Sequence, residues 1–388
     1  MLGEEQEGPQ ASSVGDDGDA VDMNDILQQV NDLISEEKLF AAERLLMQVP
    51  ESMWTDKHKQ VVETSREIQN AIADLFHHGR PPHADHLDDA SDQGGWKRQG
   101  ENHGGHHDTT IYYKVDHATS RLTCRIETPM ELSLLVPLLA VLNEVELYTD
   151  WIPSWRVPIR IGVDTATMLH QEGRANQTLQ VTGNVPWPYH KRQVILQAIA
   201  VDAIEGRTHN QSDNGQDNDD DDESFIAVRI KNPETGGVVP PPEPGVERVD
   251  FDGAFVFQAC PKERITTIKI GDEEEPTLLL ASFKMHMNPH MAGIPISVFN
   301  FITRTVLGAA WAKLLRIAEG VRDGKLPNHK KNIQEKAEFY AWVERRVNIM
   351  VHKIKSKHSS SSIGNENRSA TEQQNAVEVV GGTMLAGA

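Results

Sequence analysis

The feature that most constrains this fold is a long series of strand-like segments with almost no helix between them. Two segments, IYYKVD from Ile111 and RLTCRIE from Arg121, are split by HATS and are typical of a hairpin. After one helical stretch come VPIRIGV, NQTLQVTGNV, RQVILQAIAVDAI, SFIAVRIKN, RVDFDGAFVFQAC, ERITTIKI and TLLLASFKMHM. Because parallel strands need crossover helices, this order predicts an antiparallel, strongly curved sheet.

Helical periodicity occurs at three places around this sheet. The stretch PMELSLLVPLLAVLNEVELYTDWIPSW has Leu and Val three and four residues apart, and Pro137 predicts a break into two pieces. A long helix is expected from Pro295 to about Glu319, and another over about 332–357. The first carries an apolar stripe of Phe299, Ile302, Val306, Ala310, Leu314 and Ile317, and the second places Phe339, Val343, Val347, Met350 and Ile354 on one face.

Changes in composition and hydrophobic pattern divide the chain into six parts. They are a disordered leader (1–22), a helical hairpin (23–80), a linker (81–107), the sheet-and-helix domain (108–323), a basic amphipathic helix (330–358) and a disordered tail (359–388). The hairpin is too small to bury much core alone, so it either packs on the main domain or meets a protein partner.

Charge and cysteine content exclude several classes of function. With 58 acidic against 38 basic residues, the chain lacks the surplus cations that a nucleic-acid-binding protein needs. Cys124 and Cys260 lie in strand-like segments and are expected to be buried free thiols in a reducing compartment. The chain has no apolar leader and no uninterrupted apolar run of about 18 residues, so a cytoplasmic location is expected.

Neither a metal nor a cofactor is expected. The histidines between His77 and His107 lie in a stretch without an ordering scaffold, and DNDDDDE lacks the turn glycine and closing glutamate of an EF-hand.

Four segments in order resemble the START family, the StAR-related lipid-transfer domains. They are ELYTDWIPSW, VPWPYHKRQVILQAIAVDAI, VVPPPEPGVERVDFDGAFVFQ and NPHMAGIPISVFNFI. The resemblance covers residues 108 to 323 and implies an α+β helix-grip fold, with a curved antiparallel sheet wrapped around a long C-terminal helix. It also implies a gated hydrophobic tunnel for one sterol, phospholipid or sphingolipid.

The sequence departs from the family where the polar end of a ligand would be held. The family's Arg-Asp pair appears as Arg192-Gln193, and a frequent tunnel-facing arginine is replaced around Gln197 and Ala198. Candidate ligand contacts are aromatic or polar residues of the domain together with the stripe of the 295–319 helix. They are Trp151, Trp187, Arg192, Gln197, Arg229, Phe299, Ile302, Val306, Ala310 and Leu314. For the stripe and the tryptophans, ordinary core packing is the alternative.

The basic helix has two interpretations. Residues 330–358 hold eight Lys or Arg against three Glu, so the helix either contacts an anionic membrane transiently or packs its apolar face on the domain.

Three functions remain open at this stage. The first is non-enzymatic lipid binding, with transfer between membranes or sensing, by a cytoplasmic protein that is peripheral on membranes. The second is an interaction protein whose START-like domain is a regulatory ligand sensor. The third is a helix-grip enzyme of the cyclase type, for which no catalytic arrangement stands out in the sequence.

Overall fold

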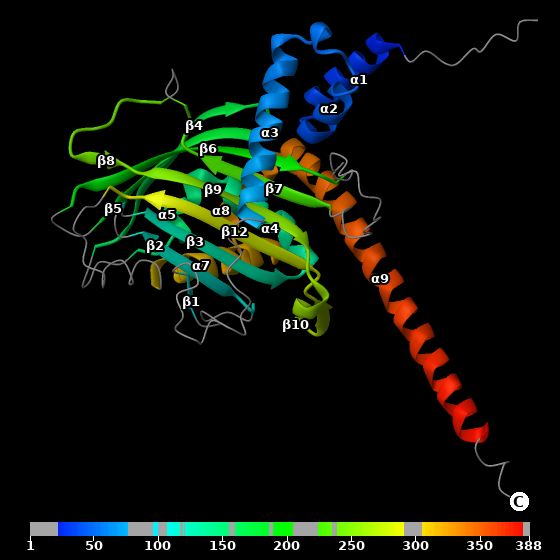
Figure 1. The fold of residues 1–388 in the computed structure, drawn as a ribbon. Coiled ribbons are helices and arrows are strands. Elements are labelled where there is room, and N and C mark those ends of the chain that lie inside the picture. The colour runs from blue at the N-terminus through cyan, green and yellow to red at the C-terminus, as the bar shows by residue number, and fades with distance from the viewer. Residues whose placement is uncertain are drawn as a thin grey trace, which may run out of the picture.

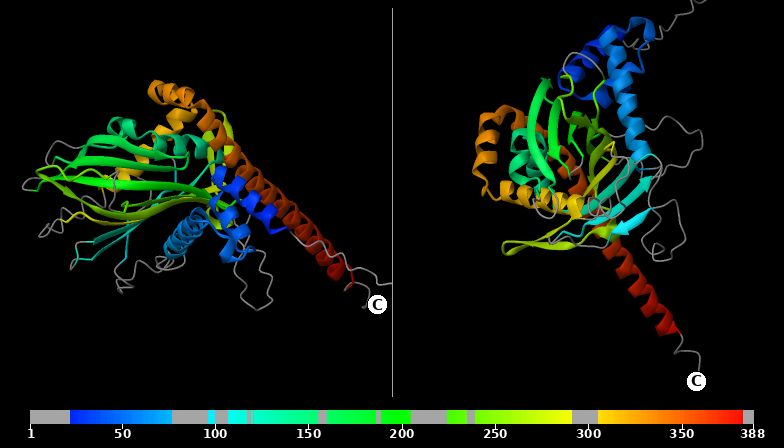
Figure 2. Two further views of the ribbon diagram at one scale, coloured as in Figure 1. Left: turned by 90° about the horizontal axis from the view of Figure 1, so that it is seen from above. Right: turned by 90° about the vertical axis from the view of Figure 1, so that its left-hand side faces the viewer.

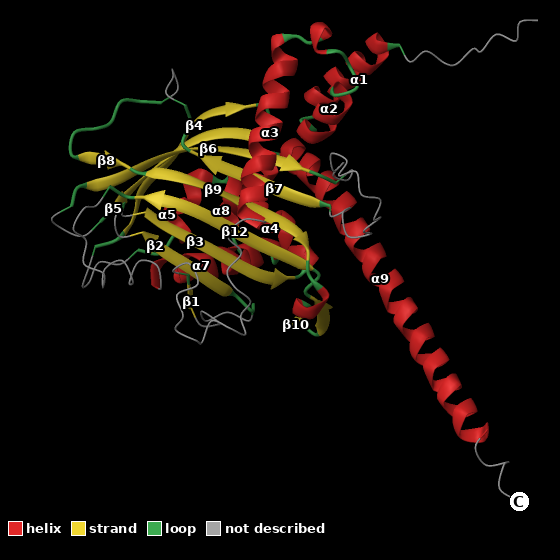
Figure 3. Cartoon of the chain, viewed as in Figure 1, coloured by secondary structure: helices red, strands yellow, loops and turns green. Residues whose placement is uncertain are grey.

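The computed structural model describes residues 22–76, 96–99, 107–116, 119, 121–154, 160–185, 189–204, 224–234, 239–290 and 305–382. Figures 1 and 3 show one large sheet with helices on both faces. The helices are α1 (Met23–Ser35), α2 (Leu39–Leu46), α3 (Asp56–Phe76), α4 (Leu135–Asn143), α5 (Tyr148–Trp151), α7 (Leu307–Arg322), α8 (Pro327–Glu335) and α9 (Ala337–Gly382). The strands are β1 (Lys97–Gln99), β2 (Thr110–Asp116), β3 (Arg121–Met130), β4 (Gly162–Glu172), β5 (Asn176–Asn184), β6 (Lys191–Asp202), β7 (Phe225–Lys231), β8 (Val246–Arg248), β9 (Asp250–Ala259), β10 (Thr267–Ile270), β11 (Glu273–Pro276) and β12 (Leu279–Asn288).

The sheet is antiparallel along its whole path, as the sequence predicts. Its order is β1-β2-β3-β12-β9-β7-β6-β5-β4, with β8 pairing parallel to β6 and β10–β11 forming a separate hairpin. The sheet curves around the helices on one side (Figure 2). Strand β4 reaches Glu172, beyond the predicted segment that ends at Val163. The extension was missed because it is an edge strand with mostly polar or exposed residues and no apolar alternation to mark it.

The N-terminal helices pack on the convex face of the sheet. Ile68 and Ile72 of α3 are at most 1% exposed and contact a convex cluster that includes Val201, Ala227 and Val256. Figure 2 shows α3 on the side opposite α4, α7 and α8. Of the two alternatives for the hairpin, packing on the main domain is therefore the one observed. Helices α1 and α2 pack against the first half of α3 in a separate cluster that includes Val30, Leu46 and Val61.

Pro137 does not break the helix in which it lies. It occupies the first turn of α4, where backbone N–H groups have no intrahelical acceptor, so the missing donor costs little. The break comes at Glu144 instead, where ψ is 74°, and a short 3-10 turn then leads into α5. The expected division into two pieces is thus present, but its cause is the backbone of Glu144.

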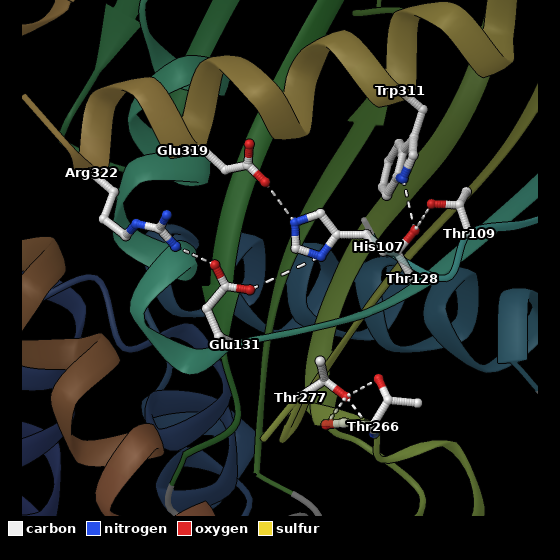
Figure 4. Close-up of polar contacts among 9 residues, drawn as sticks. All are labelled: His107, Thr109, Thr128, Glu131, Thr266, Thr277, Trp311, Glu319 and Arg322. Carbon is white, nitrogen blue, oxygen red and sulfur yellow. Dashed lines mark hydrogen bonds and ion pairs between the residues drawn. The ribbon is translucent and has the colours of Figure 1, made fainter. Parts of the chain in front are cut away.

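Helix α7 packs against the concave face through Trp311. Its ring stacks on Phe255 and Phe283, and its Nε1 donates a hydrogen bond to Thr128 Oγ1 at 2.8 Å. At the other end of α7, Glu319 lies 2.9 Å from His107 Nε2, and Arg322 pairs with Glu131, which is fully buried (Figure 4). Contacts with β3, β9 and β12 near one end, and with His107 and Glu131 beside β2 and β3 near the other, thus hold α7 in place.

The predicted basic helix is two helices, α8 and α9, that meet at Lys336. The apolar face of α9 is buried in the main core through Val343, Val347, Met350 and Ile354, so the packing interpretation of this face is confirmed. Helix α9 continues to Gly382, well beyond the predicted end at 358, through a stretch without proline. Its C-terminal half extends away from the body (Figures 1 and 2).

Both cysteines are free and buried, as predicted. Burial raises the pKa of the Cys124 thiol to about 12 and that of Cys260 to about 11. Among the described helices none is by itself long and apolar enough to cross a membrane. Leu132–Asn143 and Val145–Trp151, bent by 84°, reach that length and composition only as a pair.

Candidate ligand-binding site

A cavity of about 150 Å³ lies between the concave face of β5–β7 and helix α9. Strand register explains its apolar floor. Gln177, Ala198 and Ile230 are cross-strand neighbours on β5, β6 and β7, and Ala200 pairs with Val228 one step along. Because side chains alternate between the two faces of a sheet, these residues all point to the same side.

Helices close the cavity over this floor. Leu139 and Leu142 of α4 form one wall, and Phe339, Trp342 and Val343 of α9 form the roof. Phe339 and Trp342 stack with centroids 6.2 Å apart. The roof of the described cavity is therefore α9, whereas the sequence pointed to the helix of residues 295–319.

A second, wider space of about 680 Å³ lies on the other side of α9. It is bordered by apolar residues of α4 and α8, such as Val136 and Ile333, and by Val321 of α7. Tyr340 and Val347 border both spaces, so one helix separates them.

Paired charges lie at one end of the first cavity. Arg346 of α9 donates a hydrogen bond through Nε to Asp202 of β6 at 2.8 Å, and both side chains are largely buried. Arg174, in the β4–β5 turn, lies with its guanidinium 5.7 Å from the centre of the Trp342 ring, a cation–π contact. Glu37, from the connection between α1 and α2, completes this end. The site therefore has an apolar interior and a charged mouth.

A buried carboxylate ties α9 to α4 beside the cavity. Glu144 is fully buried and accepts hydrogen bonds from Asn332 at 2.8 Å, Lys336 at 2.9 Å and the hydroxyl of Tyr340. Burial acts to raise the pKa of Glu144, but hydrogen bonds from Tyr340, Lys336 and Asn332 outweigh it and hold the pKa below its ordinary value. Glu144 is thus an ionised anchor for the start of α9.

Two predicted contacts, Gln197 and Arg229, lie on the opposite side of the sheet from the cavity. Gln197 donates to Asn176 at 3.2 Å, and Arg229 pairs with Asp252 and lies 3.6 Å from Glu67 of α3. Successive side chains of a strand point to opposite faces of the sheet. Ala198 and Ile230 face the concave side and line the cavity, so the adjacent Gln197 and Arg229 face the convex side.

Arg192 and Trp151 are engaged in the framework of the domain. Arg192 is 7% exposed, donates to the Pro289 carbonyl at 2.7 Å and pairs with Glu247 of β8 at 2.7 Å. Burial lowers the pKa of this guanidinium. Glu247 thus supplies the carboxylate that the neighbouring Gln193 lacks. Trp151 packs edge-on against Tyr148, at 5.5 Å between centroids, inside the main core.

The stripe of the 295–319 helix is only partly described. Val306 and Ala310 are half-buried and Leu314 is buried in the main core, and none of the three lines the cavity under α9. Trp187, Phe299 and Ile302 lie outside the described residues. The ligand contacts predicted for the whole set stay predictions.

Sequence reasoning missed the residues that do line the cavity. One signal was available, since Phe339, Val343 and Val347 share the face predicted for the basic helix. No local pattern marked Glu37 or Arg174, which meet across 137 residues of chain.

Comparisons with known proteins show a likeness of fold. No family model matches the chain, and no curated protein matches it. Among solved structures, one match is the STAR-related lipid transfer protein (fragment 25-204) from Xanthomonas axonopodis, at 15% identity and a TM-score of 0.37, over 58% of this chain and 99% of that one. Another is human STARD10, at 13% identity and a TM-score of 0.39, over 69% of this chain and 89% of that one.

Norcoclaurine synthase from Thalictrum flavum matches at 14% identity and a TM-score of 0.21, over 57% of this chain and 95% of that one. At such identities and TM-scores the likeness concerns the arrangement of elements only, and no function follows from it. That arrangement, a curved antiparallel sheet closed around helices, is visible in the structure itself and agrees with the α+β architecture that the sequence predicts.

Proposed function

We propose that this chain binds a lipid in the cavity between the concave face of its sheet and α9, without catalysing a reaction. The observation that carries the proposal is an apolar floor from β5–β7, roofed by aromatic residues of α9, with a cluster of charged residues, Glu37, Arg174, Asp202 and Arg346, in the lining. Such a site suits an amphipathic molecule, since each buried methylene contributes about 0.8 kcal/mol.

We propose further that α9 is the gate. The described cavity holds about 150 Å³, whereas pockets for larger ligands span about 300–1,000 Å³. A wider space of about 680 Å³ lies directly behind α9. A shift of α9 would join the two spaces and admit a larger molecule, so we expect ligand entry to require movement of this helix.

Native mass spectrometry of the purified chain, followed by extraction and identification of any bound molecule, tests lipid binding directly. Uptake of fluorescent sterol, phosphatidylcholine, ceramide and fatty acid identifies the class of ligand. A protein that is isolated empty and takes up none of these would contradict the proposal.

A cavity-filling variant tests the location of the site. Ala200 is half-buried and lines the cavity floor, so Ala200→Leu should reduce uptake by occupying ligand space. Ala341→Leu adds the same volume to an exposed position of α9 and is the matched control. Equal uptake by the two variants would place the ligand elsewhere.

Transfer between membranes or sensing at a membrane is the further step that we propose for this site. Arg345 and Lys355 of α9 are exposed, as is Lys330 of α8. Each cation near an anionic bilayer contributes about 1 kcal/mol. Arg345→Glu with Lys355→Glu should therefore weaken sedimentation with phosphatidylserine vesicles, most strongly at low salt. Vesicle binding that neither salt nor these changes affect would remove the membrane from the proposal.

A further inference from the structure

The mouth of the cavity contains a carboxylate held by two backbone amides. Glu37 Oε1 accepts from the amide of Arg174 at 2.6 Å, and Oε2 accepts from the amide of Ala175 at 2.7 Å. Both amides belong to the β4–β5 turn, next to the apolar floor. A Cβ at Gly173, where φ is +63°, would lie 2.6 Å from Glu37 Oε1, so the carboxylate sits directly on the turn.

Local structure does not explain why a glutamate occupies this position. The amide of Glu37 donates to the Ile34 carbonyl and that of Lys38 to the Leu33 carbonyl, which is the Schellman end of a helix. The residue at this position has φ 61°, a conformation that favours glycine or asparagine. Glutamate therefore costs backbone energy here, and its contribution lies in what its side chain reaches.

The surroundings of the turn favour an anion. Arg174 contributes a guanidinium above Trp342, and among the described residues no carboxylate lies within ion-pair distance of it. The other carboxylate of the cavity, Asp202, is already paired with Arg346. Two amide donors thus hold the carboxylate of Glu37, and the Arg174 guanidinium lies on the same turn, over Trp342 and beyond ion-pair distance of that carboxylate.

We propose that the amides of Arg174 and Ala175, with the Arg174 guanidinium, form the head-group site for a single-chain lipid carboxylate, and that Glu37 occupies this site when no ligand is bound. The inference rests on the proposed function, since the chain of the ligand lies in the cavity described above. A carboxylate head can take the two amides as Glu37 does. A single chain also suits a cavity of about 150 Å³ better than a fused ring system or two acyl chains.

Equilibrium dialysis of the full chain with dodecanoate, dodecanol and dodecylamine tests this assignment. Dodecanoate should bind more tightly than the other two, which have the same chain with a neutral or cationic head. Glu37→Gln removes the competing charge and should strengthen dodecanoate binding about tenfold, while dodecanol binding stays unchanged. Glu36→Gln changes the neighbouring exposed carboxylate and is the control.

Arg174→Gln provides a second, opposite change. It should weaken dodecanoate binding about tenfold and leave dodecanol unaffected. Equal shifts for both ligands in either variant, or competition by acetate as strong as that by dodecanoate, would overturn the head-group site. If dodecanol binds and dodecanoate binds no more tightly, lipid binding in the cavity is supported and the head-group site is contradicted. If neither binds, both proposals fall.

Discussion

The two faces of the central sheet are covered by helices in different ways. On the convex face, α3 makes direct apolar contact, and Ile68 and Ile72 are at most 1% exposed. Lys231 adds an ion pair to Glu67 of the same helix. On the concave face, Val228 and Ile230 lie on β7, the strand that also carries Lys231, and are half-buried beside a cavity.

The difference in packing between the two faces indicates that the convex face serves mainly stability and the concave face mainly ligand binding. Protein interiors are close-packed, and unfilled space forfeits dispersion contacts. On β7, Phe225 and Ala227 on the convex face meet that standard, whereas Val228 and Ile230 on the concave face border unfilled space. The concave face thus keeps space that a ligand can fill, and the convex face supplies rigidity beneath it.

The largest expected effect compares a truncation on each face. Ile72→Ala on the convex side should cost about 2–5 kcal/mol of unfolding free energy, because it leaves a new cavity in a packed contact. Ile230→Ala borders existing space and should cost about 1–2 kcal/mol. Urea unfolding measures both values. Equal losses would mean that the two faces are packed alike.

A smaller effect is expected at the anchor of α9. Glu144→Ala removes the acceptor of the buried Tyr340 hydroxyl and should destabilise the chain by about 1–3 kcal/mol. The same change should raise ligand uptake by loosening the roof of the cavity. Paired unfolding and uptake measurements check this, with Glu338→Ala on an exposed position of α9 as the control. Loss of stability with unchanged uptake would show that α9 does not limit entry.

The smallest effect is a dependence of stability on pH. The folded-state pKa of Glu144 lies below its ordinary value of 4.5, so its stabilising contribution is present above that pH. It is lost as the pH falls below 4.5 through the lowered pKa. Glu144→Gln should flatten the stability curve in that acidic window and leave its slope near pH 7 unchanged. A variant curve parallel to that of the wild type would contradict the assignment.

Much of the fold could be predicted from local patterns. Alternating apolar residues identified strands such as β6 and β9, and spacing by three or four identified the buried face of α9. The ligand site was harder to predict from the sequence, because the pattern of a strand does not show which of its two faces lies on the concave side of the sheet. Gln197 and Arg229 were predicted as ligand contacts because they are polar residues on apolar strands. Each lies one residue away from a residue that lines the cavity, Ala198 beside Gln197 and Ile230 beside Arg229.

The sequence by itself determined most of the element types and the antiparallel character of the sheet, since both follow from patterns of residues close together in the chain. Only the tertiary structure decided that α3 seals one face, that α9 roofs the other, and that Glu37 meets the turn of Arg174. These contacts join segments far apart in the chain, 137 residues for Glu37 and Arg174 and 196 for Glu144 and Tyr340, and they depend on how strands twist and helices cross. The periodicity of a sequence shows which face of its own helix or strand a residue occupies. The packing of the elements determines which other segment that face contacts.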